Sequence, residues 1–94
     1  MNIHPTSIIS KEAKLDPSVV VGPYSIIRGD VTIGKNTIIE NHVVLGSDEG
    51  CVVIGEGNHF FAGAAVGGAP QDKKYNGEKT KVIMGDNNHI REYV

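Results

Sequence analysis

Aliphatic residues recur at every sixth position along the first half of this chain. An α-helix does not explain this period, because residues six apart do not share a helical face. In each repeat the residue four places after the aliphatic one is small or β-branched. The residue directly after the aliphatic one is often Gly, Asp or Glu. The pattern predicts one short strand and one turn per repeat, with the aliphatic side chain inside. The aliphatic positions are Ile3, Ile9, Leu15, Val21, Ile27, Ile33, Ile39 and Leu45.

These repeats resemble the hexapeptide-repeat proteins, in which three repeats form one coil of a left-handed parallel β-helix. The resemblance covers nearly the whole chain. It implies an all-β triangular prism of about five coils, with residues 1–94 as a single domain. The alternative is a β-sandwich of short strands, which would also be rich in Val and Ile. A sandwich gives no reason to keep a six-residue phase through so many repeats, so the β-helix is favoured.

The residue before each aliphatic position should point away from the prism, and repeats three apart should stack on one face. On a first face these outward residues are Ile8, Ile26 and Val44, and on a third face they are Val20 and Ile38. On the second face they are Lys14 and Thr32, which keep it polar. Apolar ladders of this kind predict an interface, and left-handed hexapeptide helices commonly pack as trimers, so we expect a homotrimer. The alternative is that these are scattered surface aliphatics without a partner.

The six-residue phase breaks twice after Leu45. It slips by three residues and resumes at Ile54, and it is interrupted again before Met84. We therefore predict inserted loops at residues 46–53 and 72–83. The repeats at Leu45 and Val66 are three apart, so both loops should leave one corner in successive coils, at the end of the polar second face. Loops on a rigid scaffold often carry function, which makes this corner the candidate site.

Composition narrows the classes of partner. The net charge of −2 comes with no basic patch, which argues against nucleic acid. The single cysteine, Cys51, excludes an internal disulfide and has no Cys or His neighbours at zinc-ligand spacing, so we expect it to be a buried apolar residue and predict no metal. No window approaches the roughly 20 apolar residues of a membrane span. We predict a cytoplasmic protein without membrane insertion.

The segments "HPTSIISKEAKL" and "GAPQDKKYNGEKTKVIMGDNNHIREYV" resemble the N-terminal part of the UDP-N-acetylglucosamine O-acyltransferase family of lipid A biosynthesis. The resemblance implies transfer of a 3-hydroxyacyl chain from acyl carrier protein to the 3-hydroxyl of UDP-N-acetylglucosamine, without a cofactor. It also implies a general-base histidine in a segment beyond Val94, so this chain alone should be inactive. No histidine here matches that base, and we expect all four to lie on the surface or in turns: His4, His42, His59 and His89.

The same resemblance implies that the second loop binds substrate. Gln71 would form hydrogen bonds to the sugar, Asp72 would accept one from a sugar hydroxyl, and Lys74 would lie near the diphosphate. From the residues alone, a solvated loop is the better interpretation, and the resemblance reverses this preference. Two other functions stay open: a non-catalytic hexapeptide scaffold, or another nucleotide-sugar acyltransferase or acetyltransferase of the same fold.

Overall fold

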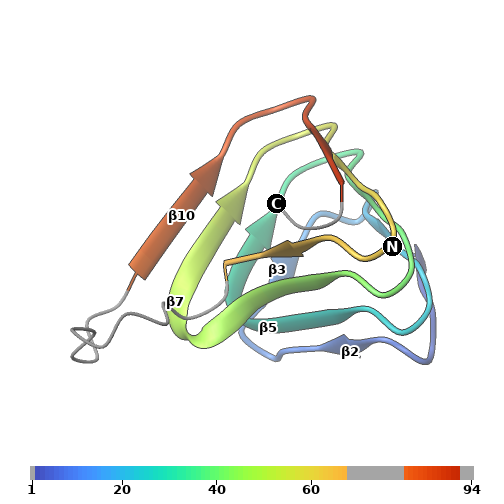
Figure 1. The fold of residues 1–94 in the computed structure, drawn as a ribbon, viewed down its shortest axis with the longest axis horizontal. Coiled ribbons are helices and arrows are strands. Elements are labelled where there is room, and N and C mark those ends of the chain that lie inside the picture. The colour runs from blue at the N-terminus through green and yellow to red at the C-terminus, as the bar shows by residue number, and fades with distance from the viewer. Residues whose placement is uncertain (1, 68–79, 92–94) are drawn as a thin grey trace.

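The chain winds into a triangular prism of stacked coils (Figure 1). The computed structural model describes residues 2–67 and 80–91, and this part of the chain contains strands and turns but no helix. The all-β prediction is confirmed. The strands are β1 (Asn2–Ile3), β2 (Ile8–Ile9), β3 (Lys14–Leu15), β4 (Val20–Val21), β5 (Ile26–Ile33), β6 (Ile38–Ile39), β7 (Val44–Ile54), β8 (His59–Phe60), β9 (Ala65–Val66), β10 (Thr80–Met84) and β11 (His89–Ile90).

Strand pairing follows the predicted stacking of every third repeat. The third face is a sheet in the order β1, β4, β6, β8, β11, with all pairs parallel. The other two faces share β5 and β7, because each of these strands continues around a corner. Their first halves pair with β2 and β9 to make the first face, and their second halves pair with β3 and β10 to make the second. In the described part, the third face therefore has five rungs and the other faces have four.

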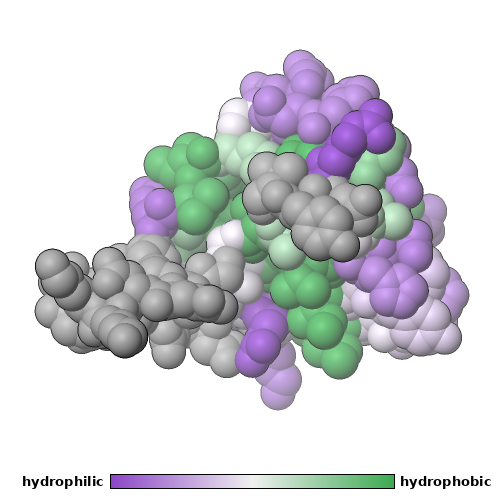
Figure 2. All heavy atoms as spheres, in the orientation of Figure 1, coloured by the Kyte–Doolittle hydropathy of each residue, from purple (hydrophilic) through white to green (hydrophobic). Residues whose placement is uncertain are grey.

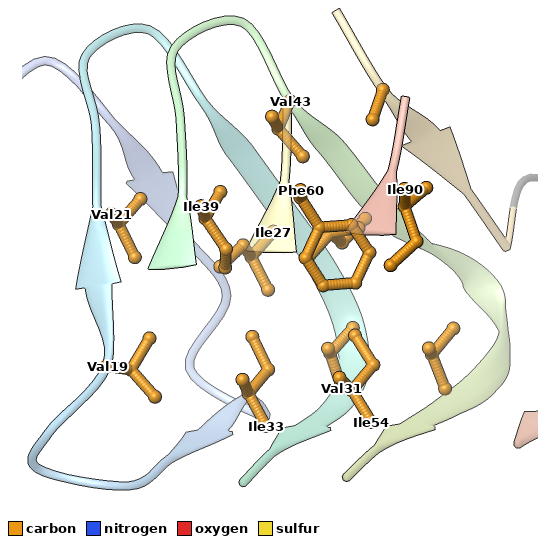
Figure 3. Close-up of a cluster of buried hydrophobic side chains, with 13 residues drawn as sticks. Val19, Val21, Ile27, Val31, Ile33, Ile39, Val43, Ile54, Phe60 and Ile90 are labelled. Atoms are coloured by element: carbon orange, nitrogen blue, oxygen red, sulfur yellow. The ribbon is translucent and has the colours of Figure 1, made fainter. Parts of the chain in front are cut away.

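The interior is filled by the two inward positions of each repeat. Side chains from all three faces point into one space (Figure 3). Phe60 is fully buried and occupies an aliphatic position of the pattern, so the periodic positions are confirmed as the core. The buried apolar residues are Val19, Val21, Ile27, Val31, Ile33, Ile39, Val43, Leu45, Val52, Ile54, Phe60, Ala64 and Ile90.

Buried polar side chains at the small position connect one coil to another. Ser25 Oγ donates to the carbonyl oxygen of Glu40 at 2.7 Å and accepts from the amide of Val43 at 3.2 Å. Asn58 Nδ2 donates to the carbonyl oxygen of Gly85 at 2.8 Å, and its Oδ1 accepts from the amide of Asn88 at 2.8 Å. These groups therefore satisfy backbone atoms at the corners, where the strand ladders stop.

The first predicted loop, residues 46–53, is mostly strand. Gly46 pairs with Arg28 and Cys51 pairs with Asp30, so residues 47–50 lie opposite Gly29 as a bulge within β7. The slip of three residues thus occupies part of a paired strand, since pairing satisfies backbone groups that a free loop would leave to water. This corner joins the end of the first face to the start of the second. The expectation that it ends the second face is wrong.

The strand pairing of β7 corrects two further predictions, the bounds of the second loop and the burial of Cys51. Residues 80–83, expected in the second loop, belong to β10 and pair with residues 50–53 of β7. Cys51 pairs with the exposed Asp30 on the outward side of the strand, while its neighbour Val52 faces the core. Cys51 is consequently a free thiol that is only half-buried, and the expectation of a buried cysteine is wrong.

The second face is also less polar than predicted. Lys14 and Thr32 lie on its outward ladder as expected, but the ladder continues through Val53 to Ile83. Ile83 is 70% exposed. The polar character is therefore limited to the earlier coils.

Gly46 provides a test of how tightly the coils stack at the bulged corner. Its φ is +82°, and an added Cβ would collide with the carbonyl oxygen of Arg28 and come within 2.6 Å of Val31 Cγ2. Because both the backbone conformation and the space exclude a side chain, we expect Gly46→Ala to lower the free energy of unfolding by at least about 2 kcal/mol. Urea unfolding measures this loss.

Gly85→Ala is the matched control, because an added Cβ there meets nothing within 4 Å. We expect its free energy of unfolding to stay within about 0.5 kcal/mol of the wild type. Equal losses in the two variants would contradict the close packing at Gly46.

Candidate functional site

The predicted site residues Gln71, Asp72 and Lys74 lie outside the described residues. The strands on either side of their segment are described. β9 ends at Val66, which pairs with Leu45, and β10 begins at Thr80, which pairs with Gly50. The segment therefore leaves the first face and rejoins the second at the corner where β7 bulges. The prediction that both interruptions share one corner in successive coils is confirmed.

Glycines recur at this corner: Gly46 and Gly67 stack directly as a glycine column, and Gly29 follows Arg28, the register partner of Gly46. Gly29, Gly46 and Gly67 occupy three successive coils with φ values of 72°, 82° and 79°. Only glycine adopts this conformation without strain. An added Cβ on Gly67 would lie 3.5 Å from the Cα of Gly46 and 2.5 Å from Val52 Cγ2, so the coils are in close contact. The candidate loop is thus attached to tightly stacked coils of the prism.

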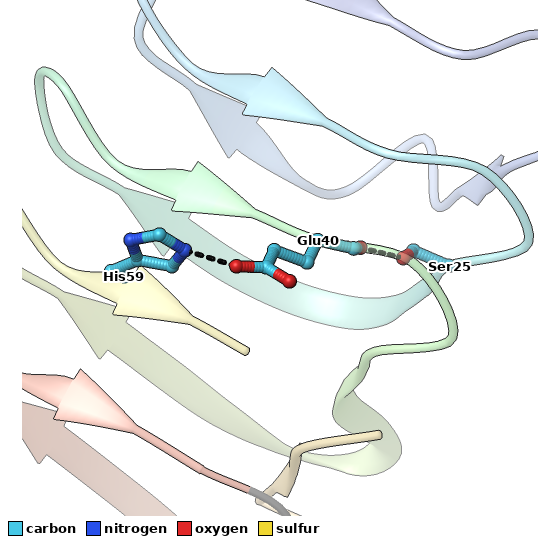
Figure 4. Close-up of polar contacts among 3 residues, drawn as sticks. All are labelled: Ser25, Glu40 and His59. Carbon is cyan, nitrogen blue, oxygen red and sulfur yellow. Dashed lines mark hydrogen bonds and ion pairs between the residues drawn. The ribbon is translucent and has the colours of Figure 1, made fainter. Parts of the chain in front are cut away.

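Polar and aromatic side chains gather at the C-terminal end of the third face. His59 Nε2 lies 2.5 Å from Glu40 Oε2 (Figure 4). The His59 ring stacks on Phe61 with 4.2 Å between centroids and 2° between planes. The Arg91 guanidinium carbon lies 4.5 Å from the centroid of the same Phe61 ring. We call these residues, with His89 tilted against both rings, the His59 cluster.

The four histidines are not all free surface residues. His4, His42 and His89 are exposed, and His42 lies in a turn with φ of 57°, as expected. His59 is half-buried and contacts the Glu40 carboxylate, a pairing that the expectation of surface or turn histidines did not include. Its partner Glu40 belongs to the preceding coil, and counting coils across the three-residue slip would have placed the two side by side.

The described residues offer no metal centre: no three His, Cys, Asp or Glu side chains among them could hold an ion together. The same part of the chain contains no helix long and apolar enough to cross a bilayer.

Asp16 lies at a different corner, between the second and third faces. The amide of Ser18 donates to its Oδ1 at 3.0 Å and the Ser18 hydroxyl donates to the same oxygen at 2.7 Å. These two bonds hold the pKa of the Asp16 carboxyl below its usual value of 3.8. A carboxyl whose pKa is lowered by folding adds to the free energy of unfolding. This contribution is fully present above pH 3.8 and is lost as the pH falls through the folded-state pKa. Asp16 therefore stabilises a turn and lies away from the candidate site.

Comparison with known proteins shows which proteins this chain resembles. Residues 12–47 match the family model described as bacterial transferase hexapeptide (six repeats). The acyl-(acyl-carrier-protein):UDP-N-acetylglucosamine O-acyltransferase of Rickettsia bellii (strain OSU 85-389) is 48% identical over 93 residues, covering 99% of this chain and 32% of that enzyme. The enzyme of the same name from Saccharophagus degradans is 50% identical over 92 residues, covering 98% of this chain and 34% of that enzyme.

In sequence, the chain is similar to the N-terminal third of these acyltransferases. The crystal structure of UDP-N-acetylglucosamine O-acyltransferase from Moraxella catarrhalis RH4 agrees, with a TM-score of 0.87 and 40% identity over 98% of this chain and 35% of that one. The fold is accordingly the left-handed parallel β-helix of the hexapeptide-repeat acyltransferases. The chain spans about a third of the length of the relatives it matches.

The Glu40–His59 contact can be tested by substitution. The two side chains are 36% and 29% exposed, so solvent screens much of their attraction. We expect Glu40→Gln to lower the free energy of unfolding by about 0.5–1 kcal/mol. In a double-mutant cycle with His59→Gln, most of that loss should disappear, because the partner is already absent.

Glu56→Gln is the control, since Glu56 is an exposed carboxylate at the corner that also carries Asp16. Its effect on urea unfolding should be negligible. Additive losses for Glu40→Gln and His59→Gln would show that the two side chains do not interact in solution.

Proposed function

We propose that this chain is the N-terminal part of an O-acyltransferase that moves a 3-hydroxyacyl group from acyl carrier protein to the 3-hydroxyl of UDP-N-acetylglucosamine, the first step of lipid A synthesis. The observation that supports this most strongly is identity of 48–50% to curated enzymes of that name over nearly every residue of the chain. Hexapeptide repeats alone would support only the fold, since one fold serves many chemistries.

The reaction needs a base and an oxyanion stabiliser. The base removes the proton of the sugar 3-hydroxyl, the sugar oxygen attacks the thioester carbonyl, and a backbone N–H stabilises the tetrahedral oxyanion. Collapse of this intermediate breaks the C–S bond, and the carrier thiol leaves with a proton. The thioester is already activated, so the scheme uses no cofactor. We assign the base to a histidine beyond Val94.

Within this chain, the proposed contribution is substrate binding by the segment that leaves the glycine corner. Gln71 and Asp72 would bond to the sugar, and Lys74 would lie near the diphosphate. The close stacking of Gly46 and Gly67 supports this role, because a rigid scaffold holds the ends of a binding segment in fixed positions. The other proposed partners are acyl-acyl carrier protein and two further copies of the protein, which would form a homotrimer. We propose that the protein acts in the cytoplasm and does not bind nucleic acid.

Asp72→Ala in the complete enzyme tests the binding role. Loss of a hydrogen-bonding carboxylate should raise the KM for UDP-N-acetylglucosamine about tenfold or more. The melting temperature should stay unchanged, because the role proposed for Asp72 is a contact with substrate. Glu12→Ala is the control, since Glu12 is an exposed carboxylate at the same corner, three coils before the segment that contains Asp72. Unchanged kinetics for Asp72→Ala would remove this segment from the site.

The position of the base gives a separate prediction. A protein of residues 1–94 should show no acyl transfer to UDP-N-acetylglucosamine when consumption of acyl-acyl carrier protein is followed, because the proposed histidine lies outside that range. The complete enzyme, assayed in parallel, should turn over. Transfer by the 94-residue protein above the uncatalysed rate would place a base among its own histidines.

A further inference from the structure

The outward ladder of the third face changes from aliphatic to imidazole side chains part-way along the prism. Ile38 pairs in register with His59, and His59 pairs with His89. The core does not require this change, because the inward neighbours Phe60 and Ile90 stay apolar and buried. The centroids of the two imidazole rings lie 6.1 Å apart. Figure 2 shows mainly hydrophilic residues on the right-hand side of the prism, where the third face lies.

The ring of Phe61 holds Arg91 beside these imidazoles. The guanidinium carbon lies 4.5 Å from the ring centroid, which is within the range of cation–π attraction. The His89 ring lies 5.9 Å from the Phe61 ring between centroids, and the His59 ring stacks on it at 4.2 Å. Phe61 is half-buried, whereas His89 and Arg91 are exposed. The half-buried ring therefore positions one guanidinium and two imidazoles around itself at the protein surface.

The His59 cluster gathers basic groups in a chain that is acidic overall. The formal net charge of the chain is −2 with its histidines neutral. Arg91 is always charged, and protonation of either imidazole adds a second positive charge close to it. Glu40 is the carboxylate in the cluster; it belongs to the coil before His59 and contacts His59 Nε2. His89 and Arg91 belong to the coil after His59, so Glu40 balances the other end of the cluster.

The donors at this end of the cluster fit an anion with several oxygen atoms. A guanidinium presents its N–H groups in a planar fork that matches phosphate oxygens, and an imidazole donates one N–H even when it is neutral. A phosphoryl group carries up to two negative charges and three acceptor oxygens, so it can accept hydrogen bonds from two side chains at once. A carboxylate carries one charge and two oxygens. The cluster therefore favours a phosphoryl group.

We propose that His89 and Arg91 bind the phosphoryl group of a ligand, with Phe61 and His59 holding them in position. This site is separate from the substrate contacts proposed for residues 71–74. The segment that contains those residues leaves and rejoins the prism at the corner between the first and second faces, whereas the cluster lies where the third face ends. The ligand is free phosphate or a nucleotide diphosphate, and binding experiments separate the two.

Isothermal titration calorimetry of the complete protein with inorganic phosphate tests this site. We expect saturable binding, and we expect Arg91→Gln and His89→Ala each to weaken it about tenfold or more, because each removes a charge-assisted hydrogen bond. Arg91→Lys should bind phosphate with intermediate affinity, since it keeps the charge and loses the planar fork. Both side chains are exposed, so thermal unfolding followed by circular dichroism should show that the variants fold like the wild type.

Lys35→Gln is the matched control, because Lys35 is an exposed cation in the turn between the second and third faces. Its affinity for phosphate should equal that of the wild type. Titration with UDP-N-acetylglucosamine identifies the source of the phosphoryl group. If Arg91→Gln and His89→Ala also weaken this binding, the ligand is the nucleotide diphosphate, and if they leave it unchanged, the ligand is free phosphate.

Three results would overturn the inference: a wild type that does not bind phosphate saturably, Arg91→Gln and His89→Ala variants that bind it as tightly as the wild type, or an equal loss in Lys35→Gln. The acyl-transfer assay judges the proposed reaction independently, because the phosphate titration does not depend on turnover.

Discussion

The whole structure depends on parallel register between coils. Each strand bonds to the strand one coil before and one coil after, so an inward residue must sit above another inward residue at every level. The column of Val21, Ile39 and Phe60 shows the result: a continuous apolar interior built from side chains that are far apart in sequence. Each coil supports its neighbours, and stability is approximately the sum of such contacts.

This register also decides where new chemistry can be attached. A residue added within a face would turn every later side chain of that strand to the other side, exposing the core. Additions are tolerated at corners, where the chain already changes direction. The glycine column shows a corner adapted to this use, because Gly46 and Gly67 let the coils touch while the chain bulges or departs. The proposed substrate-binding segment lies at that place.

Periodic features were predictable from the sequence, and features that depend on the slip were not. Ile27 and Val43 could be placed in the core, and Ile8 and Val20 outside it, because their positions follow from counting in sixes. The extent of the first loop could not be predicted, since residues 46–53 gain ladder hydrogen bonds to β5 that no local pattern reveals. Cys51 was misplaced for the same reason. The contact between Glu40 and His59 does not follow from counting in sixes alone, and only counting coils across the slip, which aligns Ile39 with Phe60, brings the two residues together.

The bulge at residues 47–50 bears on how such proteins change in length during evolution. Its three extra residues are half of a repeat, yet Ile54 still stacks on Ile33 and Phe60 still stacks on Ile39. The corner absorbs the insertion, so every later residue keeps its face. A gene can consequently gain or lose codons there without disturbing surfaces encoded downstream, whereas loss of one hexapeptide elsewhere would move each following repeat to a neighbouring face. Length variation among descendants should therefore concentrate at this corner or occur in whole coils.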